Sequence, residues 1–176
     1  MTSSSHENSN PPEEIISTFS NKRLMKLLYL LCLESVPSDY SSVGLFDVFD
    51  NMIAYPNGPV EQDIYDGLGL ITGVKYENGR IVDLKDCGNI NVSDFISQQI
   101  DDALKNLVDR IGLSKFTDTE YLINVVHSLY LWPKIYVSSS DSKSMRFSKD
   151  NIQELKNEVK VYKEFFLNKI NLEKSI

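Results

Sequence analysis

The chain has 176 residues, of which 41% are apolar, 24% charged and 10% aromatic, and it carries a net charge of -7. A chain of this length forms about one domain and can bury a core without disulfides or metals to hold it. Its longest apolar run, Leu27 to Leu33, is far shorter than the ~20 residues of a membrane-spanning helix, so we expect no membrane segment. Two unpatterned cysteines and the absence of a signal-peptide pattern predict a reduced, cytoplasmic protein.

The negative charge is concentrated in residues 36–86, which hold nine acids against three bases, whereas residues 141–176 hold six acids and eight bases. No segment clusters lysine and arginine as phosphate binding requires, which argues against nucleic acid as a partner. The acidic segment favours a protein partner with a basic surface. The alternative is a solvated surface that binds nothing.

Residues 1–12 have no hydrophobic pattern and are predicted to be a disordered leader, followed by one domain over residues 13–170 and a tail over residues 171–176. Helical periodicity begins at Glu13 and resumes after Asn21. The second part is apolar almost all round, which predicts a central helix against which the others pack. Residues 45–55 fit a helical turn or a short strand, and both interpretations stay open.

Two turns are indicated in the middle of the chain. Asn57-Gly58 predicts a turn that places Pro59 at the start of a short helix, with Glu61 and Asp63 near the positive end of its dipole. That helix would end near Leu68 and bury Val60, Ile64, Tyr65 and Leu68.

Asn78-Gly79 is the favoured two-residue turn of a β-hairpin, so residues 74–84 are predicted to form one. The expected register sets Tyr76 opposite Ile81 and Lys75 opposite Val82.

Three helices are predicted in the second half. Ser93 caps a long helix that ends before Gly112, and Thr117 with Glu120 forms a capping box for the next, which Pro133 ends. After a polar loop over residues 138–144, Ser148 caps a final helix. Its apolar spacing favours docking on its own core over binding a partner, and the residues concerned are Ile152, Leu155, Val159, Tyr162 and Phe166. The predicted fold is mainly α, a compact bundle of about five to six helices with a small β-hairpin near residues 74–84.

Residues suited to catalysis are scarce. The chain has two histidines, His6 and His127, and no ligand spacing typical of zinc, so we expect no metal and no cofactor. His127 could pair with Cys32 or Cys87 as a nucleophile, but Cys32 falls in the most apolar helix and Cys87 has no identifiable base. We therefore interpret His127 as structural and expect that the protein is not an enzyme.

Three blocks, taken in order, resemble the Panacea domain, the SocA-like antitoxin family. Lys26-Leu27-Leu28-Tyr29-Leu30 resembles the KLLY helix of the family. Ala54-Tyr55-Pro56-Asn57-Gly58-Pro59-Val60, followed by Tyr65, is similar to its signature A-W-x-x-G-P-V-x-x-x-x-Y, with Tyr55 in place of the tryptophan. His127-Ser128-Leu129-Tyr130-Leu131-Trp132 is similar to its H-S-x-x-x-W.

The resemblance implies a mainly helical antitoxin of a bacterial toxin–antitoxin pair, often carried on prophages or mobile elements, which neutralises a cognate protein toxin by direct binding. Some relatives resemble adaptors that deliver a toxin to a protease, and this is the first alternative. A regulatory binding protein of a phage or mobile element, with no toxin involved, is the second. An enzyme that uses His127 is the third.

Recognition is expected on the segment from Asn57 to Tyr65, because loops on a rigid scaffold often carry binding residues. The predicted partner-binding residues are Asn57, Gly58, Pro59, Val60, Glu61 and Tyr65. The alternative is that Gly58 and Pro59 only shape a turn and Tyr65 only fills the core. The other motif residues are predicted to be structural: Leu27, Leu28, Tyr29, Ala54, Tyr55, His127, Ser128 and Trp132.

Overall fold

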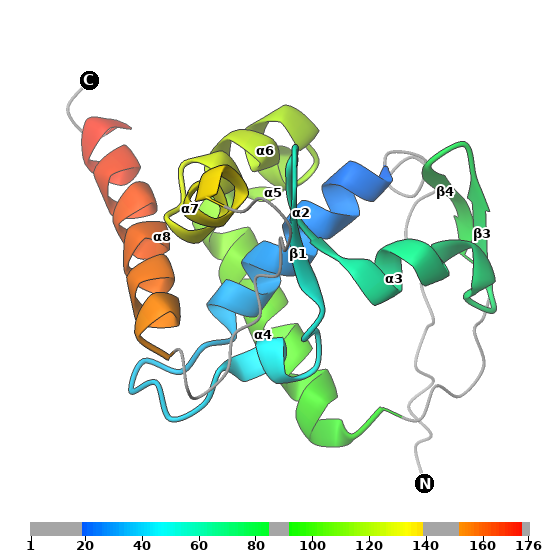
Figure 1. The fold of residues 1–176 in the computed structure, drawn as a ribbon, viewed down its shortest axis with the longest axis horizontal. Helices are drawn as coiled ribbons and strands as arrows, with labels where there is room; N and C mark the ends of the chain where they lie inside the picture. The colour runs from blue at the N-terminus through cyan, green and yellow to red at the C-terminus, as the bar shows by residue number, and fades with distance from the viewer. Residues whose placement is uncertain (1–18, 85–91, 139–151, 174–176) are drawn as a thin grey trace, which may run out of the picture.

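The computed structural model describes residues 19–84, 92–138 and 152–173 (Figure 1). In these ranges the chain forms seven α-helices, two 3-10 turns and two antiparallel pairs of strands. The predicted mainly α fold with a hairpin over residues 74–84 is confirmed, and a further strand pair nearer the N-terminus was not predicted. The predicted leader over residues 1–12 lies outside the described residues.

Helix α2 (Asn21–Glu34) is the central element. The Ser20 hydroxyl caps it by accepting a hydrogen bond from the Arg23 N–H at 3.3 Å. The helix packs against α4 (Asp94–Ile111), α6 (Thr119–His127) and strand β2 (Gly58–Glu61), and Figure 1 shows it in the middle of the molecule. Because nearly all of its faces are covered, the apolar run in the sequence buries its side chains on every side, as predicted.

The first hairpin pairs β1 (Met52–Tyr55) with β2 (Gly58–Glu61), and Pro56-Asn57 forms its two-residue turn. The ambiguous stretch before it resolves into a 3-10 turn, η1 (Gly44–Asp47), and strand β1. The predicted start of a helix at Pro59 is wrong, because Pro59 lies in β2 opposite Ala54. A two-stranded sheet leaves each strand one open edge, where a proline without an N–H is tolerated.

Helix α3 (Gln62–Gly67) begins after the hairpin, and the Glu61 side chain caps it by accepting a hydrogen bond from the Ile64 N–H at 2.7 Å. The 3-10 turn η2 (Leu68–Leu70) follows it. Tyr65 was predicted to be buried, but 42% of it is exposed, since this short helix contributes no buried residue to the core.

The second hairpin pairs β3 (Val74–Glu77) with β4 (Arg80–Leu84). Its turn residues Asn78 and Gly79 have φ values of 51° and 79°, the positive values that the predicted type I′ turn requires. Tyr76 faces Ile81 as predicted, but a bulge after Lys75 moves its partner from Val82 to Asp83. The turn is tied to the start of α2, where the Asn21 N–H donates to the Gly79 carbonyl at 3.1 Å.

Helix α4 (Asp94–Ile111) has the predicted caps, Ser93 at its start and Gly112 beyond its end. A short turn of helix, α5 (Leu113–Phe116), leads to α6 (Thr119–His127). The predicted capping box is wrong. The Asp118 carboxylate, one residue later, caps α6 at the Tyr121 N–H, while the Thr117 hydroxyl donates to the Ser114 carbonyl. Pro133 was predicted to end a helix, but it lies in the first turn of α7 (Leu131–Ser138). A proline is tolerated there because the N–H groups of the first turn have no partner within the helix.

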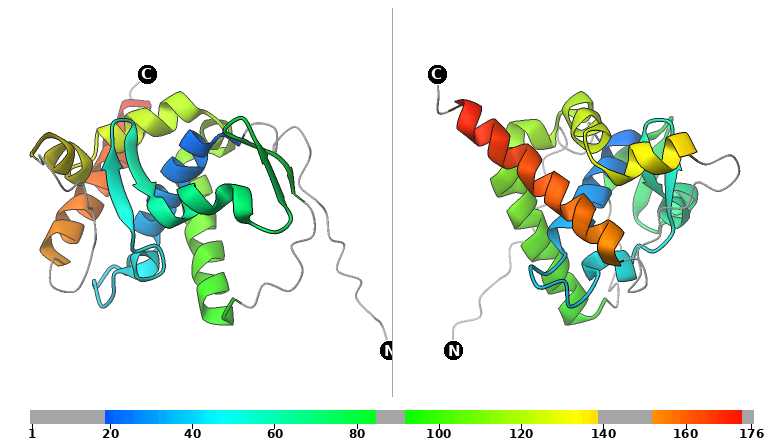
Figure 2. Two further views of the ribbon diagram at one scale, coloured as in Figure 1. Left: turned by 45° about the vertical axis from the view of Figure 1, so that its right-hand side comes forward. Right: turned by 60° about the vertical axis from the view of Figure 1, so that its left-hand side comes forward.

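Helix α8 (Ile152–Glu173) crosses the end of the molecule opposite the second hairpin (Figures 1 and 2). Its predicted stripe is docked on the core, and the helix continues to Glu173. Ser148 and residues 139–144 of the predicted loop lie outside the described residues. The stripe residues at most 2% exposed are Leu155, Val159, Tyr162 and Phe166.

Candidate partner-binding site

The three blocks that carry the family resemblance meet beneath the β1–β2 hairpin, although they lie far apart in the sequence. The Lys26 ammonium group on α2 donates a hydrogen bond to the Pro59 carbonyl at 2.8 Å. The Trp132 indole N–H on α7 donates to the Tyr55 carbonyl at 2.7 Å. A hydrogen bond joins His127 to the Asn57 backbone. The hairpin is therefore fixed on both sides by residues of the other two blocks.

Lys26 is the most unusual group of this site, because only 1% of it is exposed. Burial, with a smaller contribution from the neighbouring Lys22, lowers the pKa of Lys26 to about 7. Gly58 makes room for it: a Cβ at this position would lie 3.0 Å from the Lys26 Cε and 3.1 Å from a Val126 methyl group. With a φ of 103°, Gly58 also has a backbone conformation that other residues rarely adopt. Glycine is thus required here both by the turn and by the lysine beneath it.

His127 packs flat against Trp132, with ring centroids 4.1 Å apart and an angle of 4° between the ring planes. Tyr136 also stacks on the indole, with ring centroids 5.4 Å apart. Burial lowers the pKa of His127, the hydrogen bond to the Asn57 backbone opposes this shift, and Lys26 adds to it. These contacts give the imidazole a packing and orienting role at the base of the hairpin.

The proposed nucleophile partners of His127 are not assembled with it in the described parts of the chain. Cys32 is fully buried in α2, and burial raises the pKa of its thiol well above the usual value, which suppresses the reactive thiolate. Cys87 lies outside the described residues.

Glu158 on α8 is a buried carboxylate that the sequence analysis missed. It is fully buried and accepts hydrogen bonds from the Tyr29 hydroxyl at 2.5 Å and from the N–H groups of Tyr130 and Leu131 at 2.9 and 2.7 Å. Burial raises the pKa of Glu158, and these hydrogen bonds offset part of that rise. The signal was present in the spacing of α8, because Glu158 falls on the same face as Leu155 and Tyr162.

A cavity of about 390 Å³ opens beside the hairpin turn. Of the predicted partner-binding residues, Asn57, Val60 and Tyr65 line it, together with Tyr55. The rings of Tyr55 and Tyr65 lie 6.3 Å apart and are 39% and 42% exposed. The other three predicted residues are buried and do not line the cavity: Gly58, Pro59 and Glu61.

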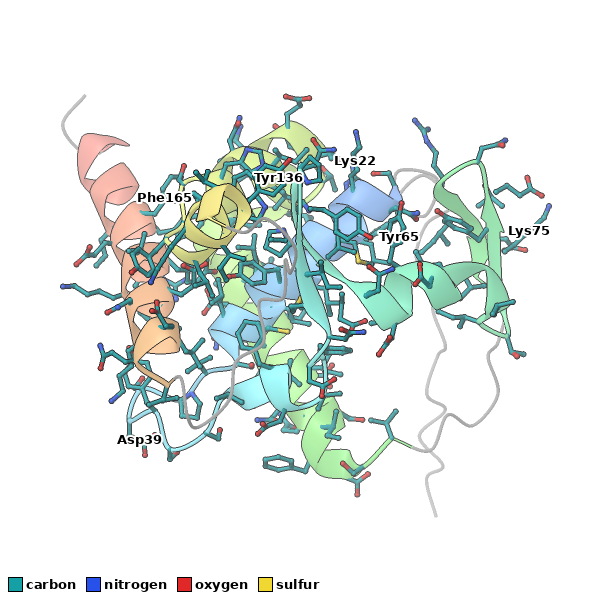
Figure 3. All side chains as sticks on the ribbon, in the orientation of Figure 1. Lys22, Asp39, Tyr65, Lys75, Tyr136 and Phe165 are labelled. Carbon is teal, nitrogen blue, oxygen red and sulfur yellow. The ribbon has the colours of Figure 1, made fainter. Side chains whose placement is uncertain are left out.

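The remaining cavity wall comes from two segments that the sequence analysis did not connect with binding. Lys22, Met25 and Lys26 contribute from α2. Asn78, Gly79 and Arg80 contribute from the turn of the second hairpin. The cavity therefore lies where α2 passes between the two hairpins, and in Figure 3 Lys22 and Tyr65 stand on the same side of the molecule, away from Asp39.

The described residues contain no cluster of three or more histidine, cysteine or carboxylate side chains placed to hold a metal ion. Within the same ranges, no helix has both the length and the apolar character needed to cross a membrane. The chain matches no protein-family model, no curated protein and no solved structure.

Proposed function

We propose that the protein is an antitoxin that resembles the Panacea family and neutralises a cognate protein toxin by direct binding in the bacterial cytoplasm. The observation that supports this proposal is the meeting of the three motif blocks at one place. Lys26, Pro59, Tyr55 and Trp132 are joined by two hydrogen bonds across three segments of the chain. A chance resemblance of three short motifs would not require that they contact one another.

The arrangement favours binding over catalysis. Two polar groups at the base of the hairpin are engaged with backbone atoms: Lys26 with the Pro59 carbonyl and Trp132 with the Tyr55 carbonyl. They hold a loop in place, as second-layer groups do in recognition sites on rigid scaffolds. Exposed aromatic rings next to a cavity, here Tyr55 and Tyr65, are typical of residues that dominate protein interfaces.

Co-expression with the product of the adjacent gene tests the proposal. We expect that the neighbouring product alone stops growth, that this protein restores growth, and that the two copurify as a complex. A harmless neighbour, or a neighbour that stays lethal in the presence of this chain, would contradict the proposal. The toxin's half-life separates direct blocking from delivery to a protease: direct blocking leaves the half-life unchanged, whereas an adaptor shortens it.

A further inference from the structure

The cavity beside the hairpin turn is lined by cations in a protein that is acidic as a whole. Among the described residues, Lys22, Lys26 and Arg80 contribute to its wall and no aspartate or glutamate does, although the chain carries a net charge of -7. Lys22 and Arg80 are exposed, and neither forms a salt bridge with another described residue. The local charge is therefore opposite to the net charge and is not neutralised by the described part of the chain.

Three features make this concentration of positive charge unfavourable for the isolated protein. Lys22 and Lys26 lie four residues apart on α2, where like charges repel. Both lie in the first half of that helix, whose first turn contains no acid to match the positive end of its dipole. Burial lowers the pKa of Arg23, which is 6% exposed; Asp118 opposes this shift, and the positive charge of Arg80 adds a smaller lowering. An anion in the cavity would relieve these repulsions.

The rest of the cavity wall is suited to a peptide. Met25, Val60 and the rings of Tyr55 and Tyr65 supply apolar surface next to the cations. The amide groups of Asn57 and Asn78 lie on two sides and can donate to or accept from a peptide backbone. A small inorganic anion would use the cations but leave the apolar wall without a contact.

We propose that the cavity binds an acidic segment of the partner protein, with a carboxylate held between Lys22 and Arg80 above the buried Lys26 and an apolar neighbour packed on the two tyrosine rings. For the identity of the partner this inference rests on the proposed antitoxin function. The acidic residues in 36–86 predict a partner with a basic surface. The cavity differs from that segment in charge, and it would bind an acidic segment of the same partner. Exposed cations at such a rim also speed association with an acidic surface.

Peptide binding tests the inference without any toxin. The probe is a fluorescein-labelled peptide in which glutamate alternates with leucine, and the comparison peptide carries glutamine in place of glutamate. We expect the full-length protein to bind the glutamate peptide at least tenfold more tightly than the glutamine peptide, as measured by fluorescence anisotropy. Equal affinity for the two peptides, or no binding of either, would overturn the inference. Displacement of the glutamate peptide by inorganic phosphate at a lower concentration than by the unlabelled peptide would also overturn it, because the site would then be one for a free anion.

Charge reversal locates the binding site. The double variant Lys22→Glu/Arg80→Glu should weaken binding of the glutamate peptide at least tenfold. The matched control Lys105→Glu/Lys160→Glu changes the net charge equally at exposed lysines that do not line the cavity, and it should weaken binding less than threefold. Circular dichroism and urea unfolding check that both variants fold. Equal losses in the two variants would show that net charge, and not the cavity, governs binding.

The same two variants separate this inference from the proposed function. If the protein neutralises a toxin, the cavity variant should lose growth rescue and the control should keep it. Rescue by both variants together with an unchanged peptide affinity would overturn the inference and leave the antitoxin proposal standing. Peptide binding that depends on Lys22 and Arg80, without any neutralisation, would overturn the antitoxin proposal and leave the inference standing.

Discussion

The ammonium group of Lys26 determines how several of its neighbours are arranged. It is buried, it has one carbonyl partner at 2.8 Å, and Gly58 is the residue that allows the hairpin to pass over it. A charged lysine in such a place is costly because desolvation disfavours the ammonium form. Two measurements on single residues follow from this arrangement.

Stability should rise with pH through Lys26. The pKa of Lys26 is about 7 in the folded chain against its ordinary value of 10.5, so between these values the unfolded chain binds more protons and stability increases as pH rises. From pH 7 to pH 9 we expect the free energy of unfolding of the wild type to rise by about 2 kcal/mol relative to Lys26→Met, as measured by urea unfolding. Parallel pH profiles for the two proteins would contradict a low pKa for this lysine.

Alanine at Gly58 should destabilise the protein more than alanine at Gly79. Both glycines have positive φ, but a Cβ at Gly58 meets Lys26 and Val126 whereas one at Gly79 meets no atom within 4 Å. We expect Gly58→Ala to lower the free energy of unfolding by about 2–4 kcal/mol and Gly79→Ala by about 1–2 kcal/mol. Thermal or urea unfolding measures both, and equal losses would mean that backbone strain alone explains the requirement for glycine at position 58.

Helix α8 is joined to the rest of the molecule by two buried carboxylates. Glu158 on α8 receives hydrogen bonds from α2 and from the start of α7, while Glu34 on α2 receives them from Tyr162 and Arg110. These polar contacts accompany an apolar stripe that is almost completely buried. The orientation of α8 is thus specified by hydrogen bonds as well as by packing.

Replacing Glu158 with glutamine should separate the contribution of the hydrogen bonds from that of the packing. The amide keeps the size of the side chain, and its oxygen can still accept from the two backbone N–H groups, but its NH2 group then faces the Tyr29 hydroxyl, whose proton is left without an acceptor, and the hydrogen bonds lose the negative charge. We expect a loss of about 2–3 kcal/mol in the free energy of unfolding. The control on the same helix is Glu164→Gln, whose exposed carboxylate lies 3.9 Å from Lys160, and it should cost less than about 0.5 kcal/mol. Similar losses at both positions would contradict the role given to Glu158.

Elements whose signal lies in adjacent residues were predictable from the sequence. The turn at Asn78-Gly79 and the cap at Ser93 follow from local backbone chemistry, and the structure has both. The first hairpin was missed because a turn followed by Pro59 also fits the start of a helix. The chain forms a hairpin there instead. Its Pro59 and Tyr55 carbonyls accept hydrogen bonds from Lys26 and Trp132, which are distant in the sequence.

The candidate site was partly predictable for a similar reason. Asn57, Val60 and Tyr65 were expected from a single segment, and they line the cavity. Lys22 and Arg80 come from α2 and from the second hairpin, and no local pattern relates them. They meet because the Asn21 N–H bonds the Gly79 carbonyl, a contact that depends on the tertiary fold.

At the scale of the whole molecule, a helical core supports one face where exposed tyrosine rings and cations surround a cavity. The core around α2 includes residues of α4, α6, α7 and α8, and the β1–β2 hairpin lies away from α8 (Figures 1 and 2). The cavity opens beside the turn of this hairpin. Tyr65 stands at the edge of this cavity with 42% of its surface exposed. A partner that docks here would reach the hairpin, the tyrosine rings and the cations together.

Copurification of the toxin with a Tyr65 variant tests this account most directly. The Tyr65→Asp substitution places a negative charge where we expect an acidic segment to dock, and Val137→Asp is the control at a residue that is 84% exposed and does not line the cavity. We predict that the wild type and the control retain the toxin in a stoichiometric complex and restore growth, while Tyr65→Asp folds normally and does neither. Retention of the toxin by a folded Tyr65→Asp variant, with full rescue of growth, would contradict recognition at this face.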